Sequence, residues 1–212
     1  MTINNKTVLA IIPARQGSTR CPDKNITCYG PSLKPLIQHA IDHAQGSKYI
    51  DTILISSDSD LILRYAVPPV IALKRPDYLS TSIASSESVI VHALYTQPAL
   101  PDFYPPPPLP DLFVLLQPTS PLRTPEDIDA CIKLSFKGSL NNSRTQTVVS
   151  VDEQGKNNGA VYVSETKTFL SRLNLNAFAH YKMPNSRSLD IDYPEDFFKE
   201  FTVEGSWKLK KP

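Results

Sequence analysis

The chain has little of several features that define common protein classes. Its 212 residues include three cysteines, Cys21, Cys28 and Cys131, and no two of them have the CxxC spacing of a zinc site. An odd number of cysteines without such spacing favours free thiols in a reducing compartment, so we expect a cytoplasmic protein. No apolar run approaches the roughly 18 residues that cross a bilayer, so we expect no contact with a membrane.

An excess of charge of one sign is also missing. Lys and Arg number 22 and Asp and Glu number 21, which gives a net charge of +1. Proteins that bind nucleic acids or membrane surfaces carry a broad basic face, so this balance predicts no nucleic-acid partner. Any anion-binding site in this chain must therefore be local.

Several catalytic motifs are absent as well. The sequence contains no GxGxxG and no GxxxxGK[ST], which argues against a dinucleotide-binding protein and an ordinary P-loop NTPase. His39 and His43 are four residues apart on a predicted helix, but HExxH and a clear third ligand are missing. We interpret them as surface histidines. No Ser-His-Asp constellation can be argued from this sequence.

Short apolar runs alternate with helical patterns along the whole chain. Apolar runs predict strands over 8–12, 52–55, 70–73, 112–116, Val148–Val151 and 160–163. Apolar residues at helical spacing predict helices over 35–44, 60–66 and 86–96, and further helices that begin at Pro125 and Pro194. This alternation predicts an α/β fold with a mostly parallel sheet. The stretch 98–110 holds seven of the 20 prolines, so we expect a stiff surface loop there; a segment that binds a partner for polyproline helices is the alternative.

The loop after the first strand concentrates positive charge. In "AIIPARQGSTRCPDKNI" the apolar run stops at Pro13, and Arg15, Arg20 and Lys24 follow around Gly17 and Ser18. Backbone N–H groups and cations in such a loop can wrap phosphates without a P-loop spacing. A solvated loop with scattered charges is the alternative. The position beyond a parallel strand favours a ligand site.

Two carboxylates stand two residues apart near the C-terminus, in "SLDIDYPEDF". Alternate side chains of an extended segment point the same way, so Asp190 and Asp192 would face one site. Converging carboxylates repel unless a cation lies between them, and Mg²⁺ prefers oxygen ligands together with waters and substrate phosphates. The alternative is that Asp192 only stabilises the start of a helix, because it stands just before Pro194, where a helix is predicted to begin.

Five stretches of the chain occur in an order that resembles a known family. They are "IIPARQGSTRCPDKNI", "RPDYLSTSIASS", "LLQPTSPLRTPEDI", "NGAVYVS" and "SLDIDYPEDF". Together they resemble the acylneuraminate cytidylyltransferases, which are CMP-sialic acid synthetases and related CMP-nonulosonic acid synthetases. The resemblance implies a Rossmann-like sheet with helices on both faces, of the nucleotide-diphospho-sugar-transferase type. It covers most of the chain, and we expect a single domain over residues 1–212.

The resemblance implies a reaction and a set of site residues. The enzyme would join CTP and an acidic nine-carbon sugar to give CMP-sugar and pyrophosphate, with Mg²⁺ as cofactor and a possible homodimer. The implied triphosphate ligands are Arg15, Ser18 and Lys24, and the cytidine ligands are Asn25, Arg75 and Ser86. On the sugar side the family implies Gln117 and Tyr162, and the metal ligands would be Asp190 and Asp192. We expect Arg15, Lys24, Asp190 and Asp192 to serve catalysis directly.

The chain departs from the family pattern in two places. Only six residues, "DEQGKN", separate Val151 from Asn158, where family members carry a longer sugar-binding and dimerisation arm. Ser82 stands where the family has an aspartate. Two alternatives follow: a degenerate CTP-binding protein without turnover, or a cytidylyltransferase for another acidic sugar such as 3-deoxy-manno-octulosonate. Lys156 or Arg187 could supply a cation that the missing arm would otherwise provide.

Overall fold

A seven-stranded sheet forms the centre of the computed structural model, which describes residues 3, 5–96, 108–137, 147–202 and 205–209. The strand order is β5-β4-β1-β6-β8-β7-β9. The strands are β1 (Val8–Pro13), β4 (Thr52–Ser57), β5 (Ile71–Lys74), β6 (Leu112–Leu115), β7 (Val148–Val151), β8 (Asn157–Glu165) and β9 (Ala179–Lys182). Among these seven, β8 alone is antiparallel to its neighbours, so the prediction of a mostly parallel sheet is confirmed.

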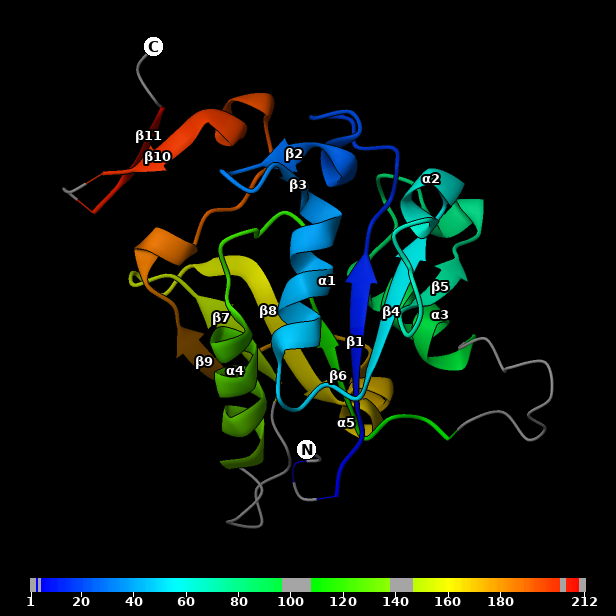
Figure 1. The fold of residues 1–212 in the computed structure, drawn as a ribbon. Coiled ribbons are helices and arrows are strands. Elements are labelled where there is room, and N and C mark those ends of the chain that lie inside the picture. Colours follow the sequence, from blue (N-terminus) through cyan, green and yellow to red (C-terminus); the bar gives the residue numbers. More distant parts are fainter. Residues whose placement is uncertain (1–2, 4, 97–107, 138–146, 203–204, 210–212) are drawn as a thin grey trace.

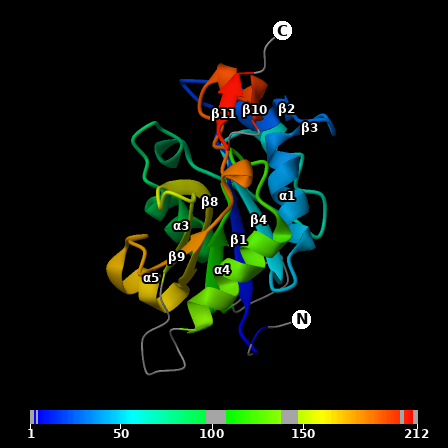
Figure 2. The ribbon, with the colours of Figure 1, turned by 90° about the vertical axis from the view of Figure 1, so that its left-hand side faces the viewer.

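Helices cover both faces of the sheet, as predicted (Figure 2). On one face lie α1 (Leu36–Gly46) and α4 (Pro125–Lys137). On the other lie α3 (Ser86–Tyr95) and α5 (Thr166–Arg172). The short α2 (Asp60–Leu63) follows β4. Within the described residues, no helix is long and apolar enough to cross a membrane.

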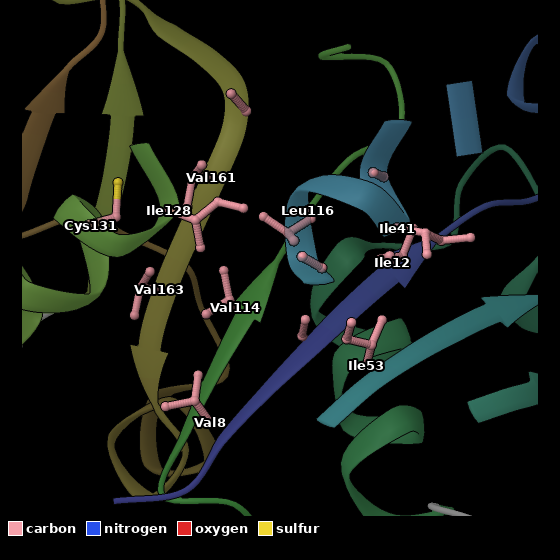
Figure 3. Packing of buried hydrophobic residues seen from close by; sticks show 14 of the residues in the cluster. Val8, Ile12, Ile41, Ile53, Val114, Leu116, Ile128, Cys131, Val161 and Val163 are labelled. Carbon is pink, nitrogen blue, oxygen red and sulfur yellow. The ribbon is translucent and has the colours of Figure 1, made fainter. Parts of the chain in front are cut away.

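The central strand β1 explains why both faces need cover. Its alternate side chains Val8 and Ile12 join the cluster under α1 and α4, whereas Leu9 and Ile11 join the cluster under α3 and α5. A strand buried on both faces needs a continuous apolar run, which the sequence supplies here. Figure 3 shows the first cluster, in which Val8 and Ile12 lie among side chains from neighbouring strands and helices.

Helix α4 begins where the sequence predicts it. Thr124 and Asp127 cap the first turn reciprocally: the Thr124 amide donates to Asp127 Oδ2 at 2.9 Å, and the Asp127 amide donates to Thr124 Oγ1 at 3.4 Å. Pro125 occupies the first helical position, where its missing N–H costs nothing. Just before this end of α4, Arg123 donates to the carbonyl of Gln117, which follows β6.

The predicted α-helix from Pro194 is wrong in type and extent. The segment forms a 3₁₀ helix, η5 (Pro194–Phe198), and the chain then enters a hairpin of β10 (Lys199–Phe201) and β11 (Trp207–Leu209). Phe197 packs against a small core cluster, but Phe198 is 67% exposed. The segment therefore offers no apolar face beyond one turn, and a longer helix would bury nothing more.

The loops at one edge of the sheet form the region that matters for function. Beyond the carboxyl ends of β1 and β4 lie the 3₁₀ helix η1 (Lys24–Ile26) and the ribbon of β2 (Cys28–Tyr29) and β3 (Lys34–Pro35), at the top of Figure 1. The β10–β11 hairpin lies at the same end. Most of the proline-rich stretch 98–110 falls outside the described residues, so its predicted loop stays a prediction.

Candidate functional site

A cavity of about 430 Å³ opens at the carboxyl ends of the parallel strands. Its lining comes from the loops after β1, β5 and β6 and from the segment before η5. All of the predicted site residues except Tyr162 lie in its wall. They are Arg15, Ser18, Lys24, Asn25, Arg75, Ser86, Gln117, Asp190 and Asp192.

The loop after β1 is held by contacts with the next strand and with η1. The amide of Ala14 donates to the Ser56 carbonyl at 3.0 Å, and the amide of Gln16 donates to Asp58 Oδ1 at 2.9 Å. Asn25, which is buried, donates from Nδ2 to the Arg15 carbonyl at 2.8 Å. The backbone on both sides of Arg15 is therefore fixed before any ligand arrives.

The side chain of Arg15 reaches the opposite rim of the cavity. Its Nη1 donates to the Thr81 carbonyl at 2.6 Å, which ties the first loop to the 80–85 loop. That loop leads into α3, where the Ser85 side chain accepts from the Ser88 amide at 3.1 Å and caps the helix. Ser86 begins the helix and is exposed to the cavity. A ligand that attracts Arg15 would compete with a backbone carbonyl.

Arg75 forms the floor of the cavity beside β4. The side chain is 4% exposed and donates from Nε to Ser56 Oγ at 3.1 Å and from Nη2 to the Ser56 carbonyl at 2.6 Å. Burial lowers the pKa of Arg75 to about 10; Asp58 raises that pKa and Arg15 lowers it. The guanidinium remains charged at neutral pH. It adds a buried positive charge to the same wall as Arg15.

Lys24 connects the first loop to the far end of the chain. Its Nζ, on a side chain 14% exposed, donates to the Ile191 carbonyl at 3.0 Å and to Asp192 Oδ1 at 3.2 Å. Arg20 Nη1 holds the other oxygen of Asp192 at 3.0 Å. Two cations from the loop after β1, Arg20 and Lys24, thus bind Asp192, which is a predicted metal ligand.

Asp190 and Asp192 share the cavity, but their surroundings differ. Burial against the cavity wall raises the pKa of Asp190, a hydrogen bond with Thr119 lowers it, and the charge of Asp192 raises it further. Asp192 is fixed through its amide, which donates to Asp196 Oδ2 at 2.8 Å. The charge of Asp190 is therefore only partly compensated, which suits a carboxylate that receives a cation.

The two carboxylates fit a divalent metal that takes its other ligands from elsewhere. Among the described residues, no group of three His, Cys, Asp or Glu side chains is placed to hold a metal ion. A pair of carboxylates that leaves room for waters and phosphates matches the ligand preference of Mg²⁺.

Gln117 follows β6 and lies against the start of β8. A Cβ atom added at Gly159 would be 2.9 Å from Gln117 Oε1 and 3.8 Å from Asp190 Oδ2. Gly159 has φ +71, a conformation that glycine adopts readily. The amide of Gln117, the backbone of Gly159 and the carboxylate of Asp190 therefore lie together.

Tyr162 stands one step back from the cavity. Its hydroxyl donates to Asn157 Oδ1 at 3.2 Å. Burial raises the pKa of Tyr162, the hydrogen bond to Asn157 lowers it, and the charge of Asp190 raises it. Tyr162 is therefore within electrostatic reach of the carboxylates without lining the cavity.

The shortened segment forms a tight turn between β7 and β8. The Asp152 amide donates to the Lys156 carbonyl at 2.8 Å, and Gly155 takes φ +84. Lys156 is exposed on this turn. Arg187 is committed to Asp127 through two bonds, from Nε at 3.0 Å and from Nη2 at 2.7 Å, so it is not a free cation.

The interpretation of the two histidines needs correction. His39 and His43 are half-buried on α1, and the buried Nδ1 of His43 has no hydrogen-bond partner among the described residues. Burial, followed by the charges of Arg123 and His39, lowers the pKa of His43 to about 3. The helix packs against α4, so His43 is not a surface histidine. The cysteines are free thiols, as predicted, and burial raises the pKa of Cys131.

Several residues that shape the site were not predicted. Asp58 accepts from the Gln16 amide, and the Thr81 carbonyl accepts from the Arg15 side chain; no local pattern indicates these two distant partners. Asp196 accepts from the amides of Asp192 and Tyr193 in a capping box at the start of η5. Gly159 carries a signal, because a glycine inside an apolar strand indicates a bend or a close approach. Arg123 lies in the quoted stretch "LLQPTSPLRTPEDI", but its burial could not be read from the sequence.

Comparison with known proteins gives consistent relatives. Residues 9–167 match the model of the family described as "Cytidylyltransferase". The CMP-N,N'-diacetyllegionaminic acid synthase of Legionella pneumophila is 31% identical over 230 residues, which cover 90% of this chain and 93% of that protein. That alignment is longer than this chain, so the relative contains residues that this chain lacks.

A second relative is longer. The N-acylneuraminate cytidylyltransferase of Escherichia coli O18:K1:H7 is 30% identical over 93% of this chain, and the chain spans 52% of its length. Among solved structures, Rv0371c from Mycobacterium tuberculosis H37Rv has a TM-score of 0.64 over 91% of this chain and 95% of that chain, with 13% identity. This likeness supports the fold. By its family match and its relatives, the chain belongs to the cytidylyltransferase family, as its resemblance to the acylneuraminate cytidylyltransferases predicts.

Proposed function

We propose that this cytidylyltransferase joins CTP to a nonulosonic acid, an acidic nine-carbon sugar, and releases pyrophosphate. The oxygen of the sugar's anomeric hydroxyl attacks the α-phosphorus of CTP and loses its proton to solvent. The bond from the α-phosphorus to the oxygen that bridges it to the β-phosphate breaks, and pyrophosphate leaves with that oxygen. One observation carries the proposal: a single cavity holds the cations Arg15 and Lys24 together with the carboxylates Asp190 and Asp192. Phosphoryl transfer needs alignment and cover for negative charge more than covalent help from the protein.

The triphosphate is assigned to Arg15, Ser18 and Lys24. Arg15 already reaches across the cavity to the Thr81 carbonyl, and a phosphate oxygen is a stronger acceptor for its guanidinium. Lys24 is held near Asp192, where its ammonium group can stabilise the negative charge that develops on the leaving pyrophosphate. Both cations are preorganised by bonds that the phosphate chain would replace or share.

The cytidine is assigned to Asn25, Arg75 and Ser86. Arg75 and Asn25 are buried at the base of the cavity, and their positions are fixed by bonds to the backbone of Ser56 and Arg15. Ser86 lies on the opposite wall at the start of α3. A flat polar base between these groups would meet donors on both sides.

A Mg²⁺ ion is assigned to Asp190 and Asp192. When bound, the ion would supply positive charge beside the phosphates of CTP. The protein's own part is to keep Asp190 oriented beside Thr119 and to hold Asp192 through Asp196. Arg20 and Lys24, which now hold Asp192, would turn toward the phosphates.

The sugar is assigned to the side of the cavity formed by Gln117, with Tyr162 behind it. Gln117 presents an amide next to Asp190, which suits the polar hydroxyls of a sugar. The Legionella pneumophila relative, named for diacetyllegionaminic acid, supports a substrate of this class. We propose no choice among sialic, legionaminic and pseudaminic acids.

The tight turn after β7 favours a second candidate, a CTP-binding protein without turnover. With only five residues between β7 and β8, the sugar side has lost the arm that the family resemblance implies. A cytidylyltransferase that uses 3-deoxy-manno-octulosonate is a third candidate. The cytoplasmic location, the single domain and the homodimer stay predictions.

The test is pyrophosphate release from CTP with each acid in turn: N-acetylneuraminate, legionaminate, pseudaminate and 3-deoxy-manno-octulosonate. Each is assayed with and without Mg²⁺, and with Asp192→Asn beside the native protein. We expect release that needs a nine-carbon acid, the metal and Asp192. CTP binding by calorimetry without release would support the second candidate, and release with the octulosonate alone would support the third.

A further inference from the structure

A buried arginine outside the assigned residues connects the two strand ends at the sugar side of the cavity. Arg123 stands just before α4 and is 1% exposed. Its Nη1 donates to the Gln117 carbonyl at 2.8 Å and to the Ala160 carbonyl at 2.6 Å. Gln117 follows β6 and Ala160 belongs to β8, so one nitrogen joins two antiparallel strands where they border the cavity.

These two carbonyls flank the contact between Gln117 and Gly159. The Gln117 side chain lies close to Gly159, and Gly159 directly precedes Ala160. Arg123 therefore fixes both partners of this contact through their backbones. Because Asp190 Oδ2 lies near the same point, the position of the Gln117 amide relative to Asp190 depends on the same clamp.

The cost of burying this side chain is large for a purely structural tie. Nε and Nη2 of Arg123 have no hydrogen-bond partner among the described residues. No carboxylate of the described residues forms an ion pair with Arg123; the nearby Asp127 pairs with Arg187 instead. Asp127 raises the pKa of Arg123 from a distance, but its own oxygens bind Arg187 and Tyr181. Even buried ion pairs can often be replaced by apolar side chains of similar volume without loss of stability, so a buried arginine without a carboxylate partner has no evident advantage for stability.

We propose that Arg123 is a positioning residue, which holds the Gln117 amide against Gly159 and beside Asp190 in the substrate cavity. The proposal deepens the proposed function, because Gln117 is there assigned to the sugar. Arg123 does not touch the cavity itself and acts only through Gln117 and Ala160.

The first measurement reads the position of Gln117 directly and needs no turnover. Side-chain amide signals of Gln117 are recorded by ¹⁵N-edited NMR in the ligand-free protein and assigned by their loss in Gln117→Ala. We expect Arg123→Met to move these signals toward those of a free glutamine and Arg123→Lys to restore them in part. Unchanged signals in folded Arg123→Met would overturn the proposal.

A second pair of variants reaches the same contact from the other side. Gly159→Ala would place a Cβ 2.9 Å from Gln117 Oε1, whereas Gly155→Ala meets nothing within 4 Å at a similar positive φ. Both should lose stability through the strained backbone, but only Gly159→Ala should move the Gln117 signals. Equal signals in the two variants would contradict the geometry on which the clamp depends.

Kinetics then separate positioning from general stability. We expect Arg123→Met to lower kcat/KM for the acidic sugar by about 10- to 100-fold, with CTP affinity unchanged within about twofold. In a Gln117→Ala background the same substitution should have little further effect, since it acts through Gln117. Arg187→Met, which breaks another arginine's buried contact, should lower the melting temperature and leave the Gln117 signals unchanged.

The outcomes distinguish this proposal from the proposed function. If the native protein turns over no acid, the proposed function fails, and the NMR comparison still decides the role of Arg123. Full additivity of Arg123→Met with Gln117→Ala, or an equal loss of CTP and sugar binding, would reject positioning through Gln117.

Discussion

The two sides of the cavity are built in different ways. On the nucleotide side, β1, β4 and β5 run parallel, and the polar loops after β1 and β5 line the cavity at one edge of the sheet. On the sugar side, β8 runs against β6 and β7, and the turn that joins β7 to β8 is only five residues long. The first side gains its groups from loops, and the second has to bring them from strands and from a distant segment.

This difference explains how each side is held. The nucleotide side is fixed by main-chain donors: the amides of Ala14 and Gln16 donate to the Ser56 carbonyl and to Asp58 Oδ1 at the end of the neighbouring strand β4. The sugar side depends on a side-chain donor, because Arg123 Nη1 binds the carbonyls of Gln117 and Ala160. Substitutions on the two sides should therefore produce different patterns of lost binding and lost stability.

The largest expected effect comes from the carboxylates where the two sides meet. Asp190→Asn and Asp192→Asn should each lower turnover by about 100-fold or more, because each removes charge that a cation requires. Their stabilities should differ in direction. Folding raises the pKa of Asp190, so the ionised carboxylate destabilises the folded protein. The folded protein therefore loses stability as pH rises through that pKa. Asp190→Asn stays neutral and should recover this stability at pH 7.

Asp192→Asn removes the ion-pair partner of Arg20 and Lys24 and should lower the melting temperature. Thermal unfolding of the metal-free proteins at pH 7 checks both directions. A fall in melting temperature for both variants would show that the carboxylates are not in the different environments described above.

The next effect separates the two substrates. Arg15→Ala should lower kcat/KM for CTP by about 100-fold, since it removes one cation from the triphosphate. Gln117→Ala should raise KM for the sugar by about 10-fold and leave CTP affinity unchanged. Steady-state kinetics with each substrate varied in turn provide the measurement.

Arg15→Lys serves as the matched control, because it keeps the charge but loses the fork of donors that reaches Thr81. An equal loss of CTP binding in Gln117→Ala would erase the distinction between the two sides.

The smallest expected effect concerns His43, on the helix α1 that packs against α4 on one face of the sheet. The pKa of His43 is lowered to about 3 in the folded protein, by burial and by Arg123 and His39, against opposing effects of Asp42 and Asp127. Stability from neutral His43 is present above pH 6.5 and is lost as pH falls from there toward 3, by at most about 1.4 kcal/mol per pH unit.

His43→Gln should therefore flatten the pH dependence of the free energy of unfolding by about 1 kcal/mol between pH 6.5 and 5. Urea unfolding at a series of pH values gives this slope, and His180→Gln, at an exposed position on β9, is the control. A wild-type slope in His43→Gln would mean that other groups carry the dependence.

Much of the fold could be predicted because its signals are local. The continuous run in β1 and the cap at Thr124 need only neighbouring residues to act, and both are where the sequence predicts them. The segment from Pro194 was predicted wrongly because its N-terminal signals are genuine, but its burial ends after one turn. His43 was misread because only the packing of α1 against α4 decides its exposure.

The candidate site divides in the same way. The sequence places Arg15 and Gln117 just beyond strand ends, and in a mostly parallel sheet those ends meet at one edge. It does not indicate that Asp58 accepts from the Gln16 amide or that Arg123 donates to the Ala160 carbonyl, because these partners lie in other segments.

By itself, then, the sequence determined the strands, the apolar faces of the helices, the family and the chemical types of the site residues, because each depends on periodicity or on short motifs. Only the tertiary structure decided that Lys24 meets Asp192 across 168 residues and that Arg123 joins β6 to β8. The physical reason is that such contacts depend on how whole strands are ordered and packed. Burial, strand order and the length of one turn fix the distances, and none of these is encoded in the residues that finally touch.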